Sequence, residues 1–512
     1  MFRHVLLRRN PVKISLNYLR REASNSSSSQ GSNSGHEQED NTKDKLPQNE
    51  NPINRTLRVL KQDVKSFKDI LSFWQDEKPE DTMARYKKLK EFPNHVDIVI
   101  IGGGAIGSSI AYWLKSTAQK GLQVAVVEKD PTYSKASSVL SVGGLRQQFS
   151  LEENIQMSLF GSEFLRNIND YLGVEGFADV DVQFQPHGYL FLASEAGAET
   201  LQTNSKLQNS LGARNVILSP QMLRDKFPWI NTEGIALGCL GLEKEGWFDP
   251  WSLLFGFKRK ALSLGVDYID GEAVDFIFVN KTQVVSDDPF FSTPQELVVR
   301  LPNGTMNTIS FSIAIIAAGA FSNNIARKAN IGTGKGLLSV PLPVEPRKRY
   351  VYCFHSPDGP GLNTPLTIDP SDTYFRREGL GGCYICGRSP EFAEEEPSID
   401  NLDVDHKFFE EKIWPILAQR VKSFENLKVV SSWAGYYEFN TFDENGIIGM
   451  HPRHNNICFA TGFSGHGIQQ APAVGRAIME LIVYSEFRTI NLSKMGFDRF
   501  INIEPIRETN IV

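Results

Sequence analysis

Residues 98–107 read Ile-Val-Ile-Ile-Gly-Gly-Gly-Ala-Ile-Gly, and this stretch decides the fold. An apolar run that meets a glycine cluster and continues as a helical pattern to about residue 117 predicts a strand, a tight turn and a helix. In that context Gly102 permits the turn, Gly104 lets a pyrophosphate approach the backbone, and Gly107 lets the helix pack closely on the strand. The start of the helix then faces the phosphates with unpaired N–H groups and the positive end of its dipole. The unit therefore predicts a dinucleotide-binding domain.

A second apolar strand, Leu122–Glu128, closes the same unit. Glu128 stands at its carboxyl end, where a ribose 2′-hydroxyl needs an acceptor. The unit alone fits both NAD and FAD, so the choice of cofactor depends on the rest of the chain.

Length and composition describe an ordinary globular protein of two domains. The chain has 512 residues, more than one typical core, with 41% hydrophobic and 22% charged residues. A net charge of −6 gives no electrostatic reason to expect a nucleic acid as a partner. Five cysteines, a low and odd number, favour a reducing compartment over a disulfide scaffold. Cys383 and Cys386 have metal or redox spacing, but their flanks read as a strand and no second pair matches, so we expect no metal site.

The N-terminal part of the chain is predicted to be a targeting signal and a linker rather than part of the folded domains. Residues 1–21 are rich in arginine and contain no acidic residue, and apolar residues lie between the basic ones. This pattern is typical of a mitochondrial targeting segment, and a basic disordered tail is the alternative. Residues 22–95 read as a polar disordered linker and a helical lead-in, which either docks on a partner or membrane surface or, as we favour, covers the neighbouring domain. Val96–Leu114 is apolar, but its central glycines indicate a strand and a helix, so we expect no membrane-spanning segment. We expect the mitochondrial matrix as the location, with peripheral attachment to the inner membrane as the alternative.

Distant segments favour FAD over NAD. The apolar strand Phe311–Ala318 runs into Gly319, whose backbone suits close packing over a phosphate or ribityl chain. The strand Ile457–Ala460 meets the turn Thr461–Gly467, and a helical pattern covers residues 471–486. Reduction of a flavin places negative charge near N1 and the C2 oxygen, where a helix N-terminus supplies donors and a favourable dipole. A nicotinamide has no equivalent demand.

With these motifs, the chain resembles the FAD-dependent D-amino-acid oxidase superfamily, in the branch of sarcosine oxidase, glycine oxidase, and sarcosine and dimethylglycine dehydrogenases. The motifs lie in family order over about residues 96–490: Gly102–Gly107 with Glu128 and Lys129, Gly143–Arg146, Gly246–Pro250, Ala317–Ser322, Trp433–Gly435 and Gly462–Gly467. The resemblance implies an α/β fold with a discontinuous Rossmann-like FAD-binding domain and a substrate domain with a large mixed β-sheet. We assign residues 96–175, 246–342 and 432–490 to the FAD-binding domain, 176–245 and 343–431 to the substrate domain, and 491–512 to a C-terminal tail.

Several positions depart from the family pattern. The family's flavin-tethering cysteine and histidine fall at Tyr436 and near Ser141, so the resemblance implies noncovalent FAD. Among family groups that hold a substrate carboxylate, a lysine falls at Gln469 and an arginine near Phe149. The lysine that helps oxidases reduce dioxygen falls close to Ile385. These departures favour a dehydrogenase over an oxidase.

Four residues are candidates for catalysis. Arg146 could balance charge on a reduced flavin, with a surface ion pair as the alternative, and Tyr436 could wall an amine pocket, with domain packing as the alternative. Glu438 could attract a cationic amine or remain a half-exposed carboxylate. His466 lies inside the best local motif and suits hydrogen bonding to flavin better than proton abstraction.

A larger set of residues is expected around the flavin. Val274 lies on a strand whose backbone could pair with an adenine edge. The expected cofactor-binding residues are Gly102, Gly104, Ile106, Gly107, Glu128, Lys129, Ser137, Ser138, Gly143, Gly144, Leu145, Arg146, Val274, Ala318, Gly319, Gly462, Phe463, Ser464, Gly465, His466, Gly467 and Ile468. Further candidates near the flavin are Arg347, Lys348, Arg349, Tyr374, Arg376 and Tyr437.

Two functions from different classes follow. The first is a mitochondrial flavoenzyme that oxidises a secondary or tertiary amine, or an N-methyl amino acid, and passes electrons to an acceptor other than dioxygen. The second is a non-enzymatic or weakly enzymatic factor that keeps FAD as a structural core and works with subunits or assembly proteins of respiratory complex I, a link that only the resemblance implies. The missing carboxylate anchors favour the second, and the intact turn Gly462–Gly467 favours the first.

Overall fold

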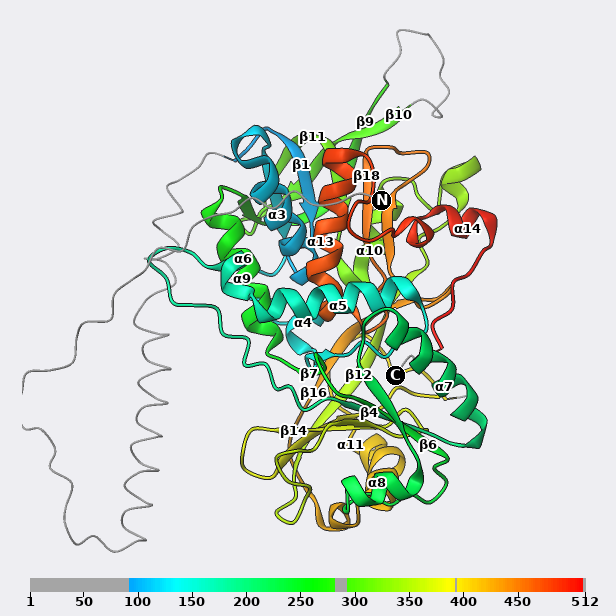
Figure 1. The fold of residues 1–512 in the computed structure, drawn as a ribbon. Helices are drawn as coiled ribbons and strands as arrows, with labels where there is room; N and C mark the ends of the chain where they lie inside the picture. The colour runs from blue at the N-terminus through cyan, green and yellow to red at the C-terminus, as the bar shows by residue number, and fades with distance from the viewer. Residues whose placement is uncertain (1–91, 281–291, 392–393, 510–512) are drawn as a thin grey trace, which may run out of the picture. The chain divides into compact units, whose positions relative to one another are not determined.

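The computed structural model describes residues 92–280, 292–391 and 394–509. The expected targeting segment and all but the last residues of the expected linker and helical lead-in lie outside these described residues. The described residues form two large sheets with the helices that cover them, and they belong to one compact unit (Figure 1).

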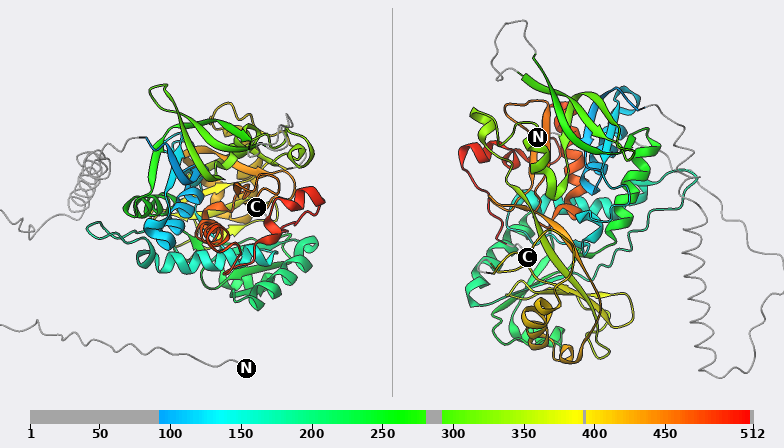
Figure 2. Two further views of the ribbon diagram at one scale, coloured as in Figure 1. Left: turned by 90° about the horizontal axis from the view of Figure 1, so that it is seen from above. Right: turned by 180° about the vertical axis from the view of Figure 1, so that it is seen from behind.

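The first sheet contains the predicted dinucleotide-binding unit. Its strands are, in spatial order, β17 (Ile447–Met450), β18 (Ile457–Thr461), β11 (Met306–Ile316), β1 (His95–Ile101), β2 (Val124–Glu128) and β8 (Asp267–Asp270), with β10 (Ser292–Arg300) and β9 (Glu272–Asn280) branching from β11. Five of them, from β18 to β8, run parallel, whereas β17 is antiparallel to β18. The β9–β10 ribbon projects from this sheet, at the end of the molecule away from the second sheet (Figures 1 and 2).

Strand β1 is apolar over residues 98–101 because hydrophobic cores pack against both of its faces. Ile100 joins one core with α3 (Ala105–Ala118) and α13 (Gly467–Tyr484), and Ile101 joins the core on the other face. Strands of a parallel sheet covered on both faces are apolar throughout. The stretch that a hydropathy window would mistake for a membrane span is therefore β1 followed by α3. In the part of the chain that the structure describes, no helix is long and apolar enough to cross a membrane.

The second sheet has eight strands and is mixed, as the resemblance implied for the substrate domain. Its order is β16 (Lys428–Asn440), β12 (Val344–His355), β15 (Cys383–Gly387), β14 (Tyr374–Glu378), β13 (Leu366–Ile368), β4 (Tyr189–Ala193), β6 (Leu237–Gly241) and β5 (Asn215–Leu218). One face buries an aromatic core under α11 (His406–Phe408), η5 (Phe409–Ile413) and α12 (Trp414–Arg420). The other face carries residues of the candidate site. The expected domain boundary at residue 432 falls inside β16, which pairs with β12 over its whole length and leads from this sheet into β17 of the first.

The remaining elements connect and cover the two sheets. A two-stranded ribbon pairs β3 (Gly144–Leu145) with β7 (Gly246–Trp247). The other helices are α4 (Ser137–Leu140), α5 (Glu152–Arg166), α6 (Ile168–Leu172), α7 (Glu195–Ser210), α8 (Pro220–Lys226), α9 (Pro250–Ser263), α10 (Ser322–Lys328) and α14 (Asp498–Asn502), with short turns η1 (Gln119–Gly121), η3 (Gly319–Phe321), η4 (Gly336–Ser339), η6 (Lys422–Asn426) and η7 (Ser493–Met495). Among the described residues, no group of three or more His, Cys, Asp or Glu side chains is placed to hold a metal ion.

Candidate functional site

The turn between β1 and α3 is shaped for a pyrophosphate. Gly102 has φ +104°, and a Cβ there would lie 2.3 Å from the carbonyl oxygen of Ala317. A Cβ on Gly107 would lie 1.9 Å from the carbonyl oxygen of Gly102, so the helix can approach the strand only with glycine at this position. Helix α3 has no acidic residue in its first turn and no side-chain cap at Gly104. Its N-terminal N–H groups and dipole therefore suit an anion.

Glu128 and Ser138 fix the two sides of this turn. The N–H of Gly103 donates to Glu128 Oε2 at 2.7 Å, and the N–H of Ala105 donates to Ser138 Oγ at 3.2 Å. Burial raises the pKa of Glu128. The carboxylate thus lies at the end of β2, where the sequence placed the ribose acceptor.

The segment with Val274 comes to the same edge of the sheet. The N–H of Gly271 donates to the carbonyl oxygen of Glu128 at 2.9 Å, and Val274 follows on β9. Lys129 points outward, is 72% exposed and pairs with Glu272 at 2.8 Å. Lys129 therefore forms an ion pair with the first residue of β9, a contact that the sequence motif did not indicate.

A cavity of about 220 Å³ lies between α3, the start of α13 and the second sheet. All four candidate catalytic residues, Arg146, Tyr436, Glu438 and His466, line it. Of the expected cofactor residues, the cavity is lined by Ile106, Ser137, Ser138, Gly144, Arg146, Gly465, His466, Gly467 and Ile468. The structure thus brings together segments that are more than 300 residues apart in the chain, as in the pairing of Arg146 with His466 (320 residues).

Other expected residues support the cavity from behind. Gly143 and Leu145 flank the lining residue Gly144. Ala318 and Gly319 start η3, and Thr461 Oγ1 lies 3.1 Å from the carbonyl oxygen of Gly319, which ties η3 to the turn with Gly462, Phe463 and Ser464. Helix α13 begins at Gly467, four residues before the expected start at residue 471, so its N-terminus lies at the cavity itself.

Arg146 and His466 form a buried pair at the cavity. Arg146 Nη2 lies 3.0 Å from His466 Nε2. A guanidinium can only donate, so Nε2 accepts and the proton of the neutral imidazole is on Nδ1. Burial, with the Arg146 charge as a second cause, holds the pKa of His466 well below its usual value. His466 is therefore a neutral hydrogen-bonding group and not a base that becomes charged near neutral pH.

Gln469 and Phe149, where the resemblance places substrate-binding cations of the family, both contact Arg146 in this structure. The Arg146 N–H donates to Gln469 Oε1 at 2.8 Å. The ring of Phe149 lies under the guanidinium at 4.4 Å and contacts the His466 ring edge-on at 5.0 Å. Gln469 and Phe149 therefore hold the Arg146–His466 pair in place.

Glu245 is a buried acid next to this pair that the sequence analysis missed. Its Oε1 accepts from the Gln147 N–H at 2.6 Å, and its Oε2 accepts from Gln148 Nε2 at 2.8 Å. Burial raises the pKa of Glu245 to about 7. The only signal in the sequence was an acid directly before the Gly246–Pro250 motif, and that signal is weak.

Glu438 is a half-buried carboxylate that lines the cavity. Its Oε2 accepts from the Gly462 N–H at 3.2 Å and from Thr461 Oγ1 at 3.3 Å. Burial raises the pKa of Glu438 to about 7. Within the described residues, no cation forms an ion pair with Glu438.

Tyrosines and one arginine of the second sheet face the same cavity. The strand register places Tyr189, Tyr374 and Arg349 on one face of the sheet. Residues directly opposite each other on paired strands, and residues two apart on one strand, share a face, and such steps connect the three side chains. The hydroxyl of Tyr436 donates to the carbonyl oxygen of Ile399 at 3.1 Å. No cysteine is among the residues that line the cavity, and the resemblance places Tyr436 at the family's tether position, so noncovalent attachment of a flavin stays our prediction.

The acidic loop after β15 forms ion pairs with three basic side chains. Glu396 binds Arg349 with both carboxylate oxygens, at 2.7 and 3.1 Å, and also pairs with Arg347 at 3.3 Å. Glu394 pairs with Lys412 at 2.6 Å. The Glu396 carboxylate of this loop is therefore bound to the guanidinium of Arg349, which faces the cavity.

Comparison with known proteins identifies the same architecture. The family model "DAO: FAD dependent oxidoreductase" matches residues 97–481. The chain is 56% identical over 427 residues to "FAD-dependent oxidoreductase domain-containing protein 1" of Xenopus laevis, covering 82% of this chain and 85% of that protein. It is 47% identical to the homologue of that protein in Drosophila melanogaster, covering 92% of this chain and 94% of the relative. Among solved structures, L-proline dehydrogenase from P. horikoshii superposes with a TM-score of 0.66 at 26% identity, covering 81% of this chain and 100% of that one.

The residues present fit FAD. The glycine turn and the start of α3, which has no acidic residue in its first turn, suit its pyrophosphate, and Glu128 suits its adenosine ribose. The start of α13 at Gly467 provides a helix N-terminus at the cavity for the ring system.

Proposed function

The chain belongs to the FAD-dependent oxidoreductase (DAO) family, and from this premise we propose that it oxidises a secondary or tertiary amine, or an N-methyl amino acid. As a family member it is a flavoprotein with FAD as cofactor. The observation that carries the substrate class is Glu438, a carboxylate that faces the cavity without a cation among the described residues. An enclosed carboxylate is stabilised by an opposite charge, which a substrate ammonium supplies.

The reaction divides the work between cofactor and protein. FAD, held at the glycine turn Gly102–Gly107 and the start of α13, would supply a hydride acceptor for the carbon beside the substrate nitrogen. Loss of that hydride would leave an imine, or an iminium ion from a tertiary amine, which water would hydrolyse to a carbonyl compound and the remaining amine. Glu438 binds and orients the amine, and the tyrosines at positions 189, 374 and 437 limit access of water. The buried Arg146 cation and the N-terminus of α13 oppose negative charge that develops in the cavity.

Arg349 provides a place for a carboxylate at the other end of the substrate. Its guanidinium already binds Glu396 in the two-bond geometry that arginine uses for carboxylates. We propose that a substrate carboxylate exchanges with Glu396 at this position, in place of the cations that the family has at Phe149 and Gln469. The name of the structural neighbour, L-proline dehydrogenase, supports this proposal, because proline is a secondary amine with a carboxylate.

A second proposed function is an assembly factor for respiratory complex I in mitochondria, with FAD as a structural cofactor. Its support is the basic, acid-free segment 1–21 and the use of Gln469 and Phe149 to hold Arg146 rather than to bind substrate. In this case the surface of the protein is the working part, and peripheral attachment to the inner membrane fits the same role.

An anaerobic reduction experiment separates the two functions. The purified holoprotein is mixed with sarcosine, N,N-dimethylglycine, L-proline and N-methylpropylamine, and bleaching of the flavin is followed by absorbance. Bleaching within seconds by at least one amine supports the oxidoreductase, and the series shows whether the carboxylate matters. A flavin that dithionite reduces and no amine reduces would overturn the amine oxidation and leave the assembly role.

A further inference from the structure

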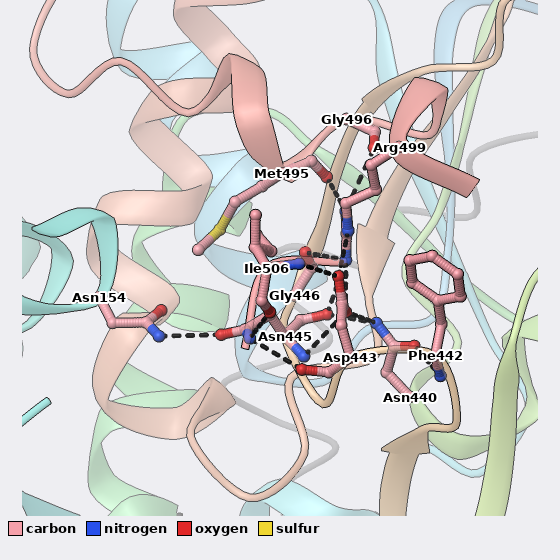
Figure 3. A network of polar contacts seen from close by, with 10 residues as sticks. All are labelled: Asn154, Asn440, Phe442, Asp443, Asn445, Gly446, Met495, Gly496, Arg499 and Ile506. Carbon is pink, nitrogen blue, oxygen red and sulfur yellow. Dashed lines mark hydrogen bonds and ion pairs between the residues drawn. The ribbon is translucent and has the colours of Figure 1, made fainter. Parts of the chain in front are cut away.

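The C-terminal segment is an integral part of the fold rather than the tail that its sequence suggested. Arg499 on α14 binds Asp443 with two hydrogen bonds, at 2.7 and 3.1 Å, and both side chains are buried (Figure 3). The Ile506 N–H also donates to Asp443, at 3.2 Å, and Asn445 Nδ2 donates to the Ile506 carbonyl oxygen at 2.7 Å. These bonds guide the chain from α14 toward α7, where Asn204 donates to Thr509 Oγ1 (Figure 1).

This path brings Glu508 to the N-terminus of α5. The Glu508 carboxylate, which is 7% exposed, accepts from the N–H groups of Ser150 and Leu151 at 2.5 and 3.1 Å. It also accepts from Asn154 Nδ2 at 3.1 Å. The N-cap residue Leu151 has no side-chain cap of its own. Glu508 therefore supplies, from more than 350 residues away in the chain, the negative charge and the acceptors that a helix N-terminus requires.

The turn that Glu508 holds is the one that carries Phe149. Phe149 lies directly before Ser150, and its ring contacts both the Arg146 guanidinium and the His466 imidazole. Its carbonyl oxygen is fixed from the other side by Gln208 Nε2 at 2.7 Å. Glu508 thus restrains the residue on which the Arg146–His466 pair rests.

A second connection reaches His466 through Asn154. Asn154 Nδ2 donates to Glu508 and to Asn445 Oδ1, and its Oδ1 accepts from Gln470 Nε2 at 3.1 Å. The Gln470 N–H donates to the carbonyl oxygen of His466 at 3.3 Å. The Glu508 carboxylate is therefore connected to the Arg146–His466 pair by two routes, one through Phe149 and one through Asn154 and Gln470.

We infer that Glu508 is a positioning residue of the flavin site, which holds Arg146 and His466 in the geometry that stabilises the reduced cofactor. Burial lowers the pKa of the Arg146 guanidinium, and the nearby Glu508 charge partly offsets this effect. The inference depends on FAD binding beside Arg146 and not on the proposed amine substrate.

The test compares Glu508→Gln with Glu504→Gln, an exposed glutamate of the same segment. The readouts are the midpoint potential of bound FAD, the dissociation constant of FAD and the melting temperature, all measured without an amine. Glu508→Gln should move the potential to more negative values and weaken FAD binding about tenfold or more, by analogy with metal sites, where loss of a residue that orients a ligand has an effect of this size. Glu504→Gln should leave both unchanged.

Either of two results with Glu508→Gln would overturn the inference. A lower melting temperature with an unchanged potential would make Glu508 a purely structural residue. A more positive potential would show that it acts only as a counter-charge. If Glu508→Gln does not load FAD, Phe149→Leu tests the same connection, because it leaves the Glu508 contacts in place and removes the ring under Arg146. An unchanged potential in Phe149→Leu would then contradict the inference.

Discussion

Glu438 and Asp443 are carboxylates on one strand and the turn that follows it, yet they have opposite surroundings. Asp443 has a side chain with 0% exposure, a two-bond ion pair with Arg499 and further hydrogen bonds from Asn440 and Ile506 (Figure 3). Glu438 is half-buried at the cavity, accepts from a backbone N–H and a hydroxyl, and pairs with no cation among the described residues.

The difference separates a structural acid from a functional one. A fully paired carboxylate has no free capacity for a ligand, and its role is to fix the turn between the two sheets. An enclosed carboxylate without a counter-charge is costly to keep and marks a site where a ligand completes it. Burial alone therefore does not identify a functional acid, whereas the state of its partners does.

The largest effect is expected from breaking the paired acid. Asp443→Asn leaves Arg499 buried without a counter-charge, so the free energy of unfolding should fall by about 3–5 kcal/mol. Denaturant unfolding of the FAD-loaded protein measures it. The matched control is Arg214→Gln, which breaks an exposed pair (side chains 69% and 46% exposed) and should cost at most about 1 kcal/mol. Equal losses in the two variants would remove the distinction between the acids.

Replacing the unpaired acid should affect activity instead of stability. Glu438→Gln keeps the shape and the acceptor for Gly462, but it cannot pair with a substrate ammonium. We expect the loss of transition-state binding for the best amine to be about 2–5 kcal/mol, so that kcat/KM falls thirtyfold or more. The free energy of unfolding at pH 7 should not fall, because the variant removes an enclosed carboxylate that has no counter-charge. Glu444→Gln, on the turn beside Asp443, serves as the control and should keep full activity. An unchanged kcat/KM in Glu438→Gln contradicts the assignment.

A titration makes the comparison more specific. The pKa of Glu438 is raised from 4.5 to about 7 in the native state, so between these values the native state holds more protons than the unfolded state. Stability from this group therefore falls as pH rises from 4.5 to about 7 and is constant outside that range. The effect is below about 3 kcal/mol, since one pKa unit is about 1.4 kcal/mol and the cavity admits solvent.

Comparison of wild type with Glu438→Gln isolates this effect, because Glu245 titrates in the same range in both proteins. The difference in unfolding free energy between them should change between pH 4.5 and 7, and kcat/KM for the amine should rise over the upper part of that range in wild type only. A pH-independent difference would mean that Glu438 does not titrate there.

Local sequence patterns predicted the elements that local sequence controls. The run into Gly102 predicted the end of β1 and both ends of α3 to within about one residue, because the apolar strand, the turn and the helix all follow from neighbouring residues. The start of β1 at His95 lies three residues before the quoted run. The start of α13 was placed four residues late, since Pro472 reads as a first-turn residue. In the structure Pro472 lies inside the helix, where Trp113 Nε1 donates to its carbonyl oxygen, so packing on α3 contributes to the position of this helix.

The parts of the site that could not be predicted depend on pairs far apart in the chain. Glu396 with Arg349 and Glu508 with Ser150 are 47 and 358 residues apart, and no local pattern connects them. The C-terminal segment was therefore predicted to be a tail, and the contact of the acidic loop with Arg349 was not predicted. Candidates inside glycine motifs, such as His466, were predictable because the motif itself specifies the backbone around them.

The smallest effect concerns the acid that occupies Arg349, and it extends the comparison to a third carboxylate. Glu396 is paired like Asp443, but its side chain is 34% exposed and can be replaced by a ligand. Glu396→Gln should lower KM for a carboxylate-bearing amine a few-fold, because the exposed pair that competes with substrate contributes about 1 kcal/mol or less. KM for N-methylpropylamine, which has no carboxylate, should not change. Glu345→Gln, which removes an exposed partner of Arg347 only, is the control for charge. If Glu396→Gln lowered KM equally for both amines, Arg349 would not be the carboxylate site, and Glu438 alone would define the substrate.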